Sequence, residues 1–117
     1  MVYVENITDE FNPGIFYNIK IGENQQENDK LIKDATIDNI WFHLSNLPSP
    51  HGILISNTNL DKIPKKIICR AAFLVKYYSK YSFLKNVKVD YITIKYIKPT
   101  DIIGEVEIKK KPKVIIV

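Results

Sequence analysis

The chain has little of what covalent catalysis, zinc binding and membrane insertion require. Its 117 residues include one cysteine, Cys69, which cannot form an internal disulfide and supplies too few thiols for a zinc knuckle. The four glycines form neither of the phosphate-binding motifs GxxxxGKS/T and GxGxxG. No apolar run approaches the roughly 20 residues that cross a bilayer, and the N-terminus lacks the features of a signal peptide. These absences predict a protein of a reducing, cytoplasmic setting with no membrane partner.

Arginine is also scarce, with one against sixteen lysines, and the charges are unevenly divided along the chain. Residues 1–59 carry 3 Lys and 8 acidic residues, a net charge of −5. Residues 60–117 carry 13 Lys, 1 Arg and 5 acidic residues, a net charge of +9, so that the whole chain has a net charge of +4. The basic half predicts attraction to polyanions if folding gathers its charge on one face. The alternative is a lysine-coated surface that is merely solvated.

The apolar pattern predicts a single α+β domain over residues 1–117. Short β-branched and aromatic stretches, separated by turn residues, predict strands at 2–7, 14–21, 39–44, 52–56, 87–98, 104–108 and 113–117. A short helix is expected to begin near Glu27 and to end near residue 35. A long helix is expected over residues 63–80. Because strands and helices do not alternate, we expect a mostly antiparallel sheet with the long helix on its face.

The long helix is the clearest element of the pattern. Pro64 suits its first turn, and Asp61 is a plausible cap before it. Its apolar stripe, at helical spacing, consists of Ile67, Ile68, Ala71, Leu74, Val75 and Tyr78. The residues left for solvent or a ligand are Lys65, Lys66, Arg70, Lys76, Tyr77 and Lys80.

Residues 38–51, DNIWFHLSNLPSPH, contain the only tryptophan and both histidines. They permit three interpretations: an active site, a metal site, or a rigid corner that presents polar groups to a ligand. His43, His51 and Asp38 could form a two-histidine, one-carboxylate site and support a small metal-dependent hydrolase, although no HExxH motif is present. Cys69 and Ser49 have no surroundings that indicate a covalent nucleophile. Trp41 and Phe42 alternate along the predicted strand, so one is expected in the core and the other free to stack.

Residues 76–88, KYYSKYSFLKNVK, interleave aromatic and basic side chains. Single-stranded nucleic acids are commonly bound by aromatic rings that stack on bases, within a positively charged groove. This stretch supplies that pattern with Tyr77, Tyr78, Tyr81 and Phe83 among Lys76, Lys80, Lys85 and Lys88. The alternative is that Tyr78 and Phe83 belong to the core and the lysines solvate its rim.

Four stretches together resemble the NFACT-R family, the RNA-binding module of the NEMF and RqcH proteins of ribosome-associated quality control. They are IGENQQENDKL at 21–31, NIWFH at 39–43, the proline-to-histidine turn that ends in His51, and VKVDYITIKYIKP at 87–99. KIPKKI at 62–67 resembles the helix start of the family's short eukaryotic coiled-coil-domain-containing member, to which the chain looks closest. The matches follow the family's order over nearly the whole chain.

The chain departs from the family pattern in three places. Asn39 stands where the family usually has Asp, with the acid one residue earlier at Asp38. The turn reads Pro48-Ser49-Pro50-His51 in place of Pro-Gly-Ser-His, and Glu23 replaces a frequent Lys. Each change removes a charge or a flexible glycine near the expected ligand surface, so a weaker affinity for nucleic acid is expected.

The resemblance implies a non-enzymatic module with no cofactor, no bound metal and no catalytic residues. Its expected partners are RNA, either tRNA or rRNA, and the ribosome, with DNA as a further candidate. The residues expected to bind nucleic acid are Trp41, His43, His51, Lys76, Tyr77, Lys80, Lys85, Lys88, Lys95 and Lys98. A protein-interaction adaptor and the metal-dependent hydrolase described above remain the alternatives, and the oligomeric state is not predicted.

Overall fold

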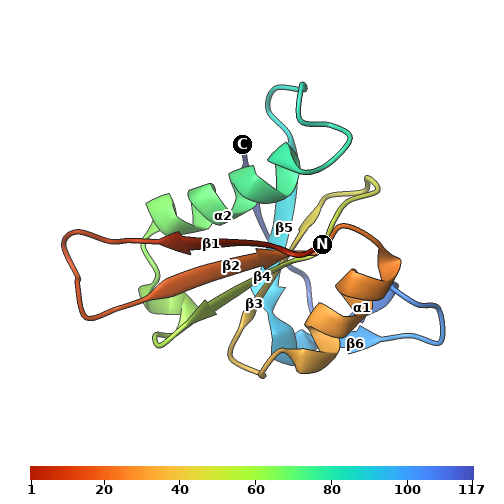
Figure 1. The fold of residues 1–117 in the computed structure, drawn as a ribbon, viewed down its shortest axis with the longest axis horizontal. Helices are drawn as coiled ribbons and strands as arrows, with labels where there is room; N and C mark the ends of the chain where they lie inside the picture. Colours follow the sequence, from red (N-terminus) through yellow and green to blue (C-terminus); the bar gives the residue numbers. More distant parts are fainter.

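A six-stranded antiparallel sheet forms the centre of the structure, a computed structural model that describes residues 1–117 (Figure 1). Its strands are β1 (Tyr3–Ile7), β2 (Tyr17–Ile21), β3 (Ile40–Leu44), β4 (Gly52–Ser56), β5 (Lys88–Thr93) and β8 (Lys113–Ile116). Their spatial order is β1-β2-β4-β3-β5-β8, and every neighbouring pair is antiparallel. Strands β6 (Ile97–Pro99) and β7 (Val106–Ile108) form a separate hairpin. The predicted α+β class with a mostly antiparallel sheet is confirmed.

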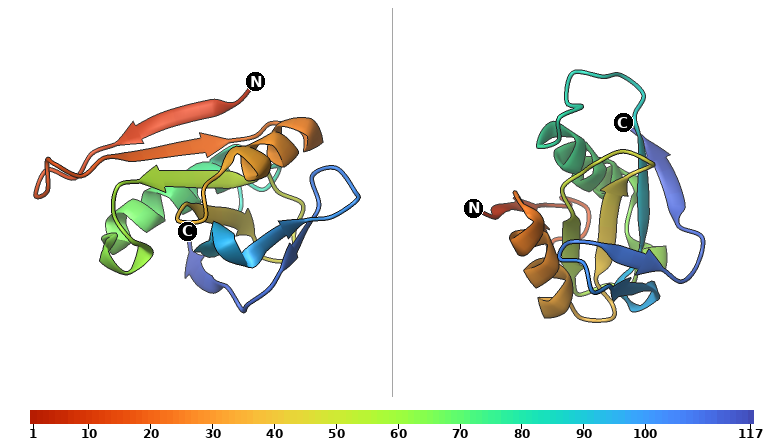
Figure 2. Two further views of the ribbon diagram at one scale, coloured as in Figure 1. Left: turned by 90° about the horizontal axis from the view of Figure 1, so that it is seen from below. Right: turned by 90° about the vertical axis from the view of Figure 1, so that its right-hand side faces the viewer.

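Both faces of the sheet are covered, each by one of the helices α1 (Gln25–Asp34) and α2 (Lys65–Tyr77) (Figure 2). Along β3, Phe42 packs in the core cluster that contains α2, whereas Trp41 packs with Ile32 of α1 and Ile97 of β6. Successive strand residues point to opposite faces, so a sheet covered on both faces needs an uninterrupted apolar run such as IWF. Trp41 and Phe42 are 1% and 0% exposed, so the prediction that one of them is free to stack is wrong.

Helix α2 is confirmed as the main packing element, with three corrections. Asp61 does not cap it, because Asp61 lies in the 3₁₀ helix η1 (Leu60–Lys62) and Pro64 takes the cap position. The helix ends at Tyr77, and Tyr78 is partly exposed and stacks on the ring of Tyr3 at 3.9 Å. Lys76, predicted to be free for solvent or a ligand, is buried.

Lys76 is buried because its stem lies against the core while its ammonium group finds an acceptor. Its Nζ donates to the carbonyl oxygen of Val117 at 3.2 Å, and 8% of the residue remains exposed. A long lysine side chain commonly buries its methylene groups in this way and keeps its charged end hydrogen-bonded. Helical spacing alone did not show that the chain terminus passes over this position.

Helix α1 begins at Gln25, two residues before the predicted start. Asn24 caps it, since the side-chain oxygen of Asn24 accepts the backbone N–H of Glu27 at 2.9 Å. This bond satisfies one of the N–H groups that a helix start leaves without a partner. Neither helix has the length and apolar character needed to cross a membrane.

The expected twelve-residue strand at 87–98 is interrupted. It divides into β5, the 3₁₀ helix η2 (Ile94–Tyr96) and β6. The backbone leaves the β5 ladder where Ile94 N–H bonds to the carbonyl of Asn39 at 2.7 Å and Lys95 N–H to that of Ile37 at 3.3 Å. As a result β6 and β7 pair outside the main sheet and help to cover its α1 face, and the predicted strand at 104–108 is reduced to β7.

Candidate nucleic-acid interface

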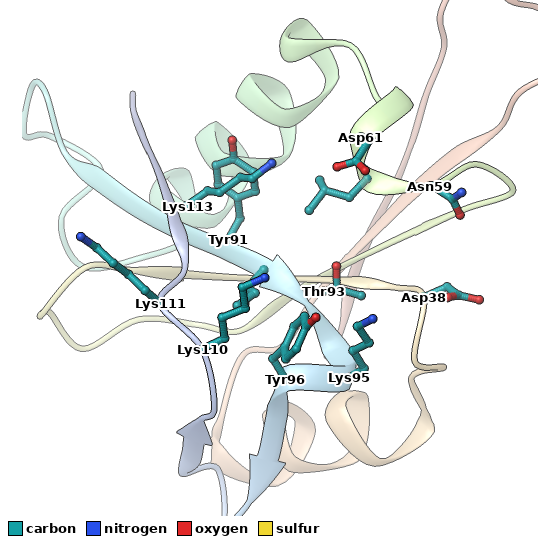
Figure 3. Close-up of a pocket in the computed structure, with 12 residues that line it drawn as sticks. Asp38, Asn59, Asp61, Tyr91, Thr93, Lys95, Tyr96, Lys110, Lys111 and Lys113 are labelled. Atoms are coloured by element: carbon teal, nitrogen blue, oxygen red, sulfur yellow. The ribbon is translucent and has the colours of Figure 1, made fainter.

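A basic pocket lies where β5 ends, between η1, η2 and the segment that leads into β8 (Figure 3). The cavity has a volume of about 350 Å³. We define the basic pocket by its lysines and tyrosines, which are Tyr91, Lys95, Tyr96, Lys110, Lys111 and Lys113. The side chains of Asp38 and Asp61 stand at its rim and reduce its positive charge.

The four lysines of the basic pocket are exposed and make no ion pair with a carboxylate. Instead, Lys95 Nζ and Lys110 Nζ lie 5.0 and 5.1 Å from the centroid of the Tyr96 ring. Such contacts hold ammonium groups beside an aromatic face without neutralising them. The pocket therefore combines unpaired positive charge with aromatic rings, the combination that single-stranded nucleic acids bind.

Two cations of α2, by contrast, are paired with carboxylates. The single arginine, Arg70, binds Glu5 of β1 through two hydrogen bonds of 2.9 and 2.8 Å. Lys66 pairs with the buried carboxylate of Asp9 at 3.2 Å. The acidic N-terminal half of the chain therefore neutralises part of the basic helix, and this leaves the basic pocket as a free concentration of positive charge.

The remaining predicted lysines divide between the two ends of β5. Lys95 and Lys98 follow its end, in η2 and β6, whereas Lys88 begins it and Lys85 lies in the loop before it. Tyr77 is the last residue of α2, and Lys80 lies in the same connection between α2 and β5, which Figure 1 shows as a loop. All six residues are exposed, but the structure does not gather them into one patch.

Trp41, His43 and His51 form a compact aromatic cluster on the α1 face of the sheet. Trp41 Nε1 donates to His51 Nδ1 at 3.1 Å, and His43 Nδ1 lies 2.7 Å from the carbonyl oxygen of Leu44. The two imidazole rings meet edge to face at a centroid distance of 5.0 Å, and the His43 ring stacks on that of Trp41 at 5.4 Å. The predicted polar cluster of the two histidines is present, but Trp41 and His51 are buried within it and offer no ring face for stacking.

Burial determines the charge state of both histidines. It lowers the pKa of His51 to about 3, and the neighbouring His43 adds to this shift. Burial also lowers the pKa of His43, because it outweighs the Leu44 carbonyl and the Asp90 carboxylate, which both raise it. Both imidazoles are therefore neutral near pH 7 and act as hydrogen-bonding groups without charge.

The position of His51 depends on the segment that joins β2 to α1. Its backbone N–H donates to the side-chain oxygen of Asn28 at 3.1 Å, and its carbonyl accepts the N–H of Gly22 at 3.1 Å. A Cβ atom on Gly22 would lie 2.2 Å from that Asn28 oxygen, so only glycine permits this approach. Residues 21–31, NIWFH and the turn at His51 thus form one connected structure.

The three residues of the hydrolase alternative do not come together. His43 and His51 line a cavity on the α1 face, whereas Asp38, which precedes β3, lies at the rim of the basic pocket. No group of three His, Cys, Asp or Glu side chains is arranged to hold a metal ion. The predicted ligand set is therefore wrong, because four residues separate Asp38 from His43, and the last three of them belong to β3.

The family assignment rests on similarity to known proteins. A family model described as "NFACT protein RNA binding domain" matches residues 3–110. The chain belongs to this family. The resemblance seen in its sequence motifs is confirmed.

NFACT relatives of known name and structure agree with this assignment. Coiled-coil domain-containing protein 25 of Bos taurus is 34% identical over 87 residues, which cover 72% of this chain and 42% of that protein. The Rqc2 homolog RqcH of Bacillus subtilis is 32% identical over 81 residues, 68% of this chain and 14% of RqcH. The C-terminal structure of the fibronectin/fibrinogen-binding protein from Streptococcus suis superposes with a TM-score of 0.76 at 31% identity, covering 86% of this chain and 40% of that one. The chain thus spans less than half the length of these relatives.

The departures from the NFACT-R pattern have structural roles. Asn39 is buried, and its side-chain oxygen accepts the N–H of Thr36 at 3.0 Å, a bond that the family's Asp could also make. Ser49 Oγ accepts the N–H of Leu44 at 3.1 Å and donates to the carbonyl of Pro50 at 2.7 Å. Glu23 binds the N-terminal ammonium group at 2.6 Å. Asn39 and Ser49 therefore hold turns in place.

The sequence-based list did not include Lys110, Lys111 and Lys113, or the half-buried Asp90 that faces His43. The run Lys109-Lys110-Lys111 is evident in the sequence, but nothing in the sequence indicates that it lies near Lys95 in the fold. That proximity arises from the pairing of β5 with β8, which matches Tyr91 with Lys113. Such long-range pairing is not encoded in local spacing.

Proposed function

We propose that this chain binds single-stranded RNA through the basic pocket, without catalysing a reaction on it. The observation that carries the proposal is the set of four lysines with no carboxylate partner, arranged around Tyr91 and Tyr96 in one cavity. Membership in the NFACT RNA-binding family supports RNA as the polyanion.

The bound RNA is tRNA or rRNA, and the cellular role is in ribosome-associated quality control in the cytoplasm. Similarity to RqcH and the implications of the NFACT-R resemblance support this finer assignment. Lysine ammonium groups contact phosphates as point charges, so binding at the basic pocket depends on charge more than on sequence. Of the residues predicted from sequence, Lys95 belongs to this pocket, whereas Lys80, Lys85, Lys88 and Lys98 lie outside it.

The salt dependence of binding tests this proposal. Filter binding with tRNA, an rRNA fragment, single-stranded RNA and duplex DNA is measured between low and physiological salt. Each phosphate contact on a single strand contributes about −0.7 to the slope of log affinity against log salt concentration. The Lys110→Ala/Lys111→Ala variant is therefore expected to flatten the slope by about 1.4.

The matched control is Lys30→Ala/Lys33→Ala on α1. It removes the same number of charges, but these lysines are paired with Asp34 and Asp29 at 2.8 Å each. This control is expected to leave the slope nearly unchanged. Equal flattening by both variants would show that net charge, and not the basic pocket, attracts the RNA.

One observation favours the adaptor alternative. An apolar groove of about 820 Å³ runs between α2 and the edge strand β8, lined by Ile63, Ile68 and Ile115 among others. If neither the unaltered protein nor any variant binds RNA or DNA near physiological salt, the groove becomes the better candidate for the functional surface and the adaptor the better assignment.

A further inference from the structure

A second cavity, of about 420 Å³, opens on the α1 face of the sheet. Its wall combines Trp41, His43, His51 and Asp90 with Ile102 and Ile103 of the loop that joins β6 to β7. That loop packs tightly on the start of α1, since a Cβ atom on Gly104 would lie 3.1 Å from the Cα atom of Gln25. Cavities of this size with a few convergent polar groups are typical sites for small ligands.

The two histidines of this cavity have fixed hydrogen-bonding roles. An indole N–H can only donate, so His51 Nδ1 is the acceptor of the Trp41 bond, and the proton of His51 is on Nε2. A carbonyl can only accept, so His43 Nδ1 carries the proton and His43 Nε2 is a free acceptor. Neither Nε2 atom has a hydrogen-bond partner in the protein. Tyr17 Oη is the one fully buried side-chain nitrogen or oxygen without such a partner, so both Nε2 atoms retain some exposure.

Asp90 provides a second acceptor beside His43. One of its carboxylate oxygens accepts the hydroxyl of Ser45, and no lysine or arginine pairs with it. Asp90 and His43 are direct partners in the β3–β5 ladder, and His51 immediately precedes β4 on the other side of β3. Across three neighbouring strands the cavity therefore presents a donor, an acceptor and an acceptor, in the order His51, His43, Asp90.

This order complements one base. The Watson–Crick edge of guanine presents O6 as an acceptor, followed by N1–H and the N2 amino group as donors. Adenine, cytosine and uracil each satisfy at most two of the three protein groups. Unpaired RNA bases are commonly read on this edge. We propose that the cavity binds one unpaired guanine, with His51 donating to O6, His43 accepting from N1–H, and Asp90 accepting from the N2 amino group.

The flanking phosphate has a candidate partner on the same face. Lys88 lies two residues before Asp90 on β5 and therefore points to the same side of the sheet. It is exposed and has no carboxylate partner. The inference rests on the proposed binding of single-stranded RNA and adds to it a site that distinguishes bases.

The test uses a uridine heptamer with guanosine at its centre, compared with heptamers that carry inosine or adenosine there. Inosine lacks only the N2 amino group. Fluorescence anisotropy near physiological salt is expected to show about tenfold weaker binding of the inosine strand, because a hydrogen bond to a charged acceptor is lost. In Asp90→Ala the guanosine and inosine strands are expected to bind equally.

Asp101→Ala is the matched control, because it removes an equal charge from an exposed position of the β6–β7 loop that does not line the cavity. It is expected to keep the tenfold ratio. Asp90→Asn keeps the size of the side chain and is expected to reduce the ratio, since neutral acceptors form weaker bonds. It serves as the second variant if Asp90→Ala does not fold.

The outcomes separate the two proposals. Binding of all heptamers with equal affinity would overturn the guanine site and leave RNA binding intact. A ratio that persists in both Asp90 variants would also overturn it. No binding of any RNA by the unaltered protein would remove both the guanine site and the proposed function.

Discussion

At the scale of single residues, each histidine has one ring nitrogen bonded inside the protein and the other free. Trp41 determines this for His51, and the Leu44 carbonyl determines it for His43. Because burial lowers the pKa of both rings, they remain neutral over the physiological range. The order of donor and acceptors that His51, His43 and Asp90 present in the guanine cavity is therefore constant near pH 7. The buried histidines cost the protein stability only at acidic pH.

That cost gives a stability prediction. The pKa of His51 is about 3 in the folded protein, whereas an unfolded histidine titrates near 6.5. Below pH 6.5 the unfolded chain takes up a proton that the folded protein does not, so the free energy of unfolding falls as the pH falls. The expected slope approaches about 1.4 kcal/mol per pH unit for this group, with a further contribution of the same sign from His43.

Urea unfolding between pH 6.5 and 4.5 measures this effect, above the range in which most carboxylates titrate. His51→Asn keeps an acceptor for Trp41 Nε1 and removes the titrating ring. It is expected to flatten the pH dependence. An unchanged slope in this variant would show that other groups cause the acid sensitivity.

A second prediction concerns Gly22. The Cβ atom of Gly22→Ala would lie 2.2 Å from the Asn28 oxygen and 3.0 Å from the Asn28 backbone nitrogen, so Asn28 must move away from His51. We expect a loss of about 1–3 kcal/mol in the free energy of unfolding, as for other overpacked positions. Gly14→Ala is the control, because nothing lies within 4 Å of its Cβ, and it should change stability by less than about 0.5 kcal/mol. Equal losses would exclude a steric cause at Gly22.

At the scale of elements, local signals predicted most of the fold and failed where distant segments meet. Helical spacing identified α2, and Asn12-Pro13-Gly14 marked the turn between β1 and β2. The run at 87–98 is rich in β-branched and aromatic residues throughout, so nothing in it marks the break at η2. Hydrogen bonds to the backbone carbonyls of Ile37 and Asn39 create this break. Likewise the chain terminus at Val117 covers Lys76.

The burial of Lys76 changes what its substitution should do. If Lys76 were exposed, its replacement by alanine would lower the free energy of unfolding by less than about 0.5 kcal/mol. Because the Lys76 stem is packed and its ammonium group is hydrogen-bonded, Lys76→Ala is expected to lower the free energy of unfolding by about 1 kcal/mol or more. The loss comes from the missing packing and the missing bond to Val117. Lys65→Ala, at an exposed position of the same helix, is the control. Urea unfolding measures both, and equal small effects would mean that the Val117 contact contributes nothing.

At the scale of the whole molecule, the predicted binding residues fall into places that the sequence could not relate. The basic pocket, the guanine cavity and the Lys85–Lys88 end of β5 come from segments far apart in the chain. Their relative positions follow from the strand order β3-β5-β8, which only the folded structure supplies. The net charge of +9 in residues 60–117 indicated a polyanion, but it could not show which basic side chains remain free after Asp9 has paired with Lys66 and Glu5 with Arg70.

The last prediction asks whether one RNA contacts both ends of β5. Lys88 is the first residue of β5, and Lys110 lines the basic pocket at the other end of this strand, so the five residue steps of β5 place the two lysines at least about 15 Å apart. Sites this far apart act independently, so the binding losses of Lys88→Ala and Lys110→Ala should add within about 0.5 kcal/mol in the double variant. The salt slope should flatten by about 0.7 in each single variant and by about 1.4 in the double. If Lys88→Ala has no effect on affinity or slope while Lys110→Ala does, the RNA stays at the basic pocket and does not cross to the α1 face.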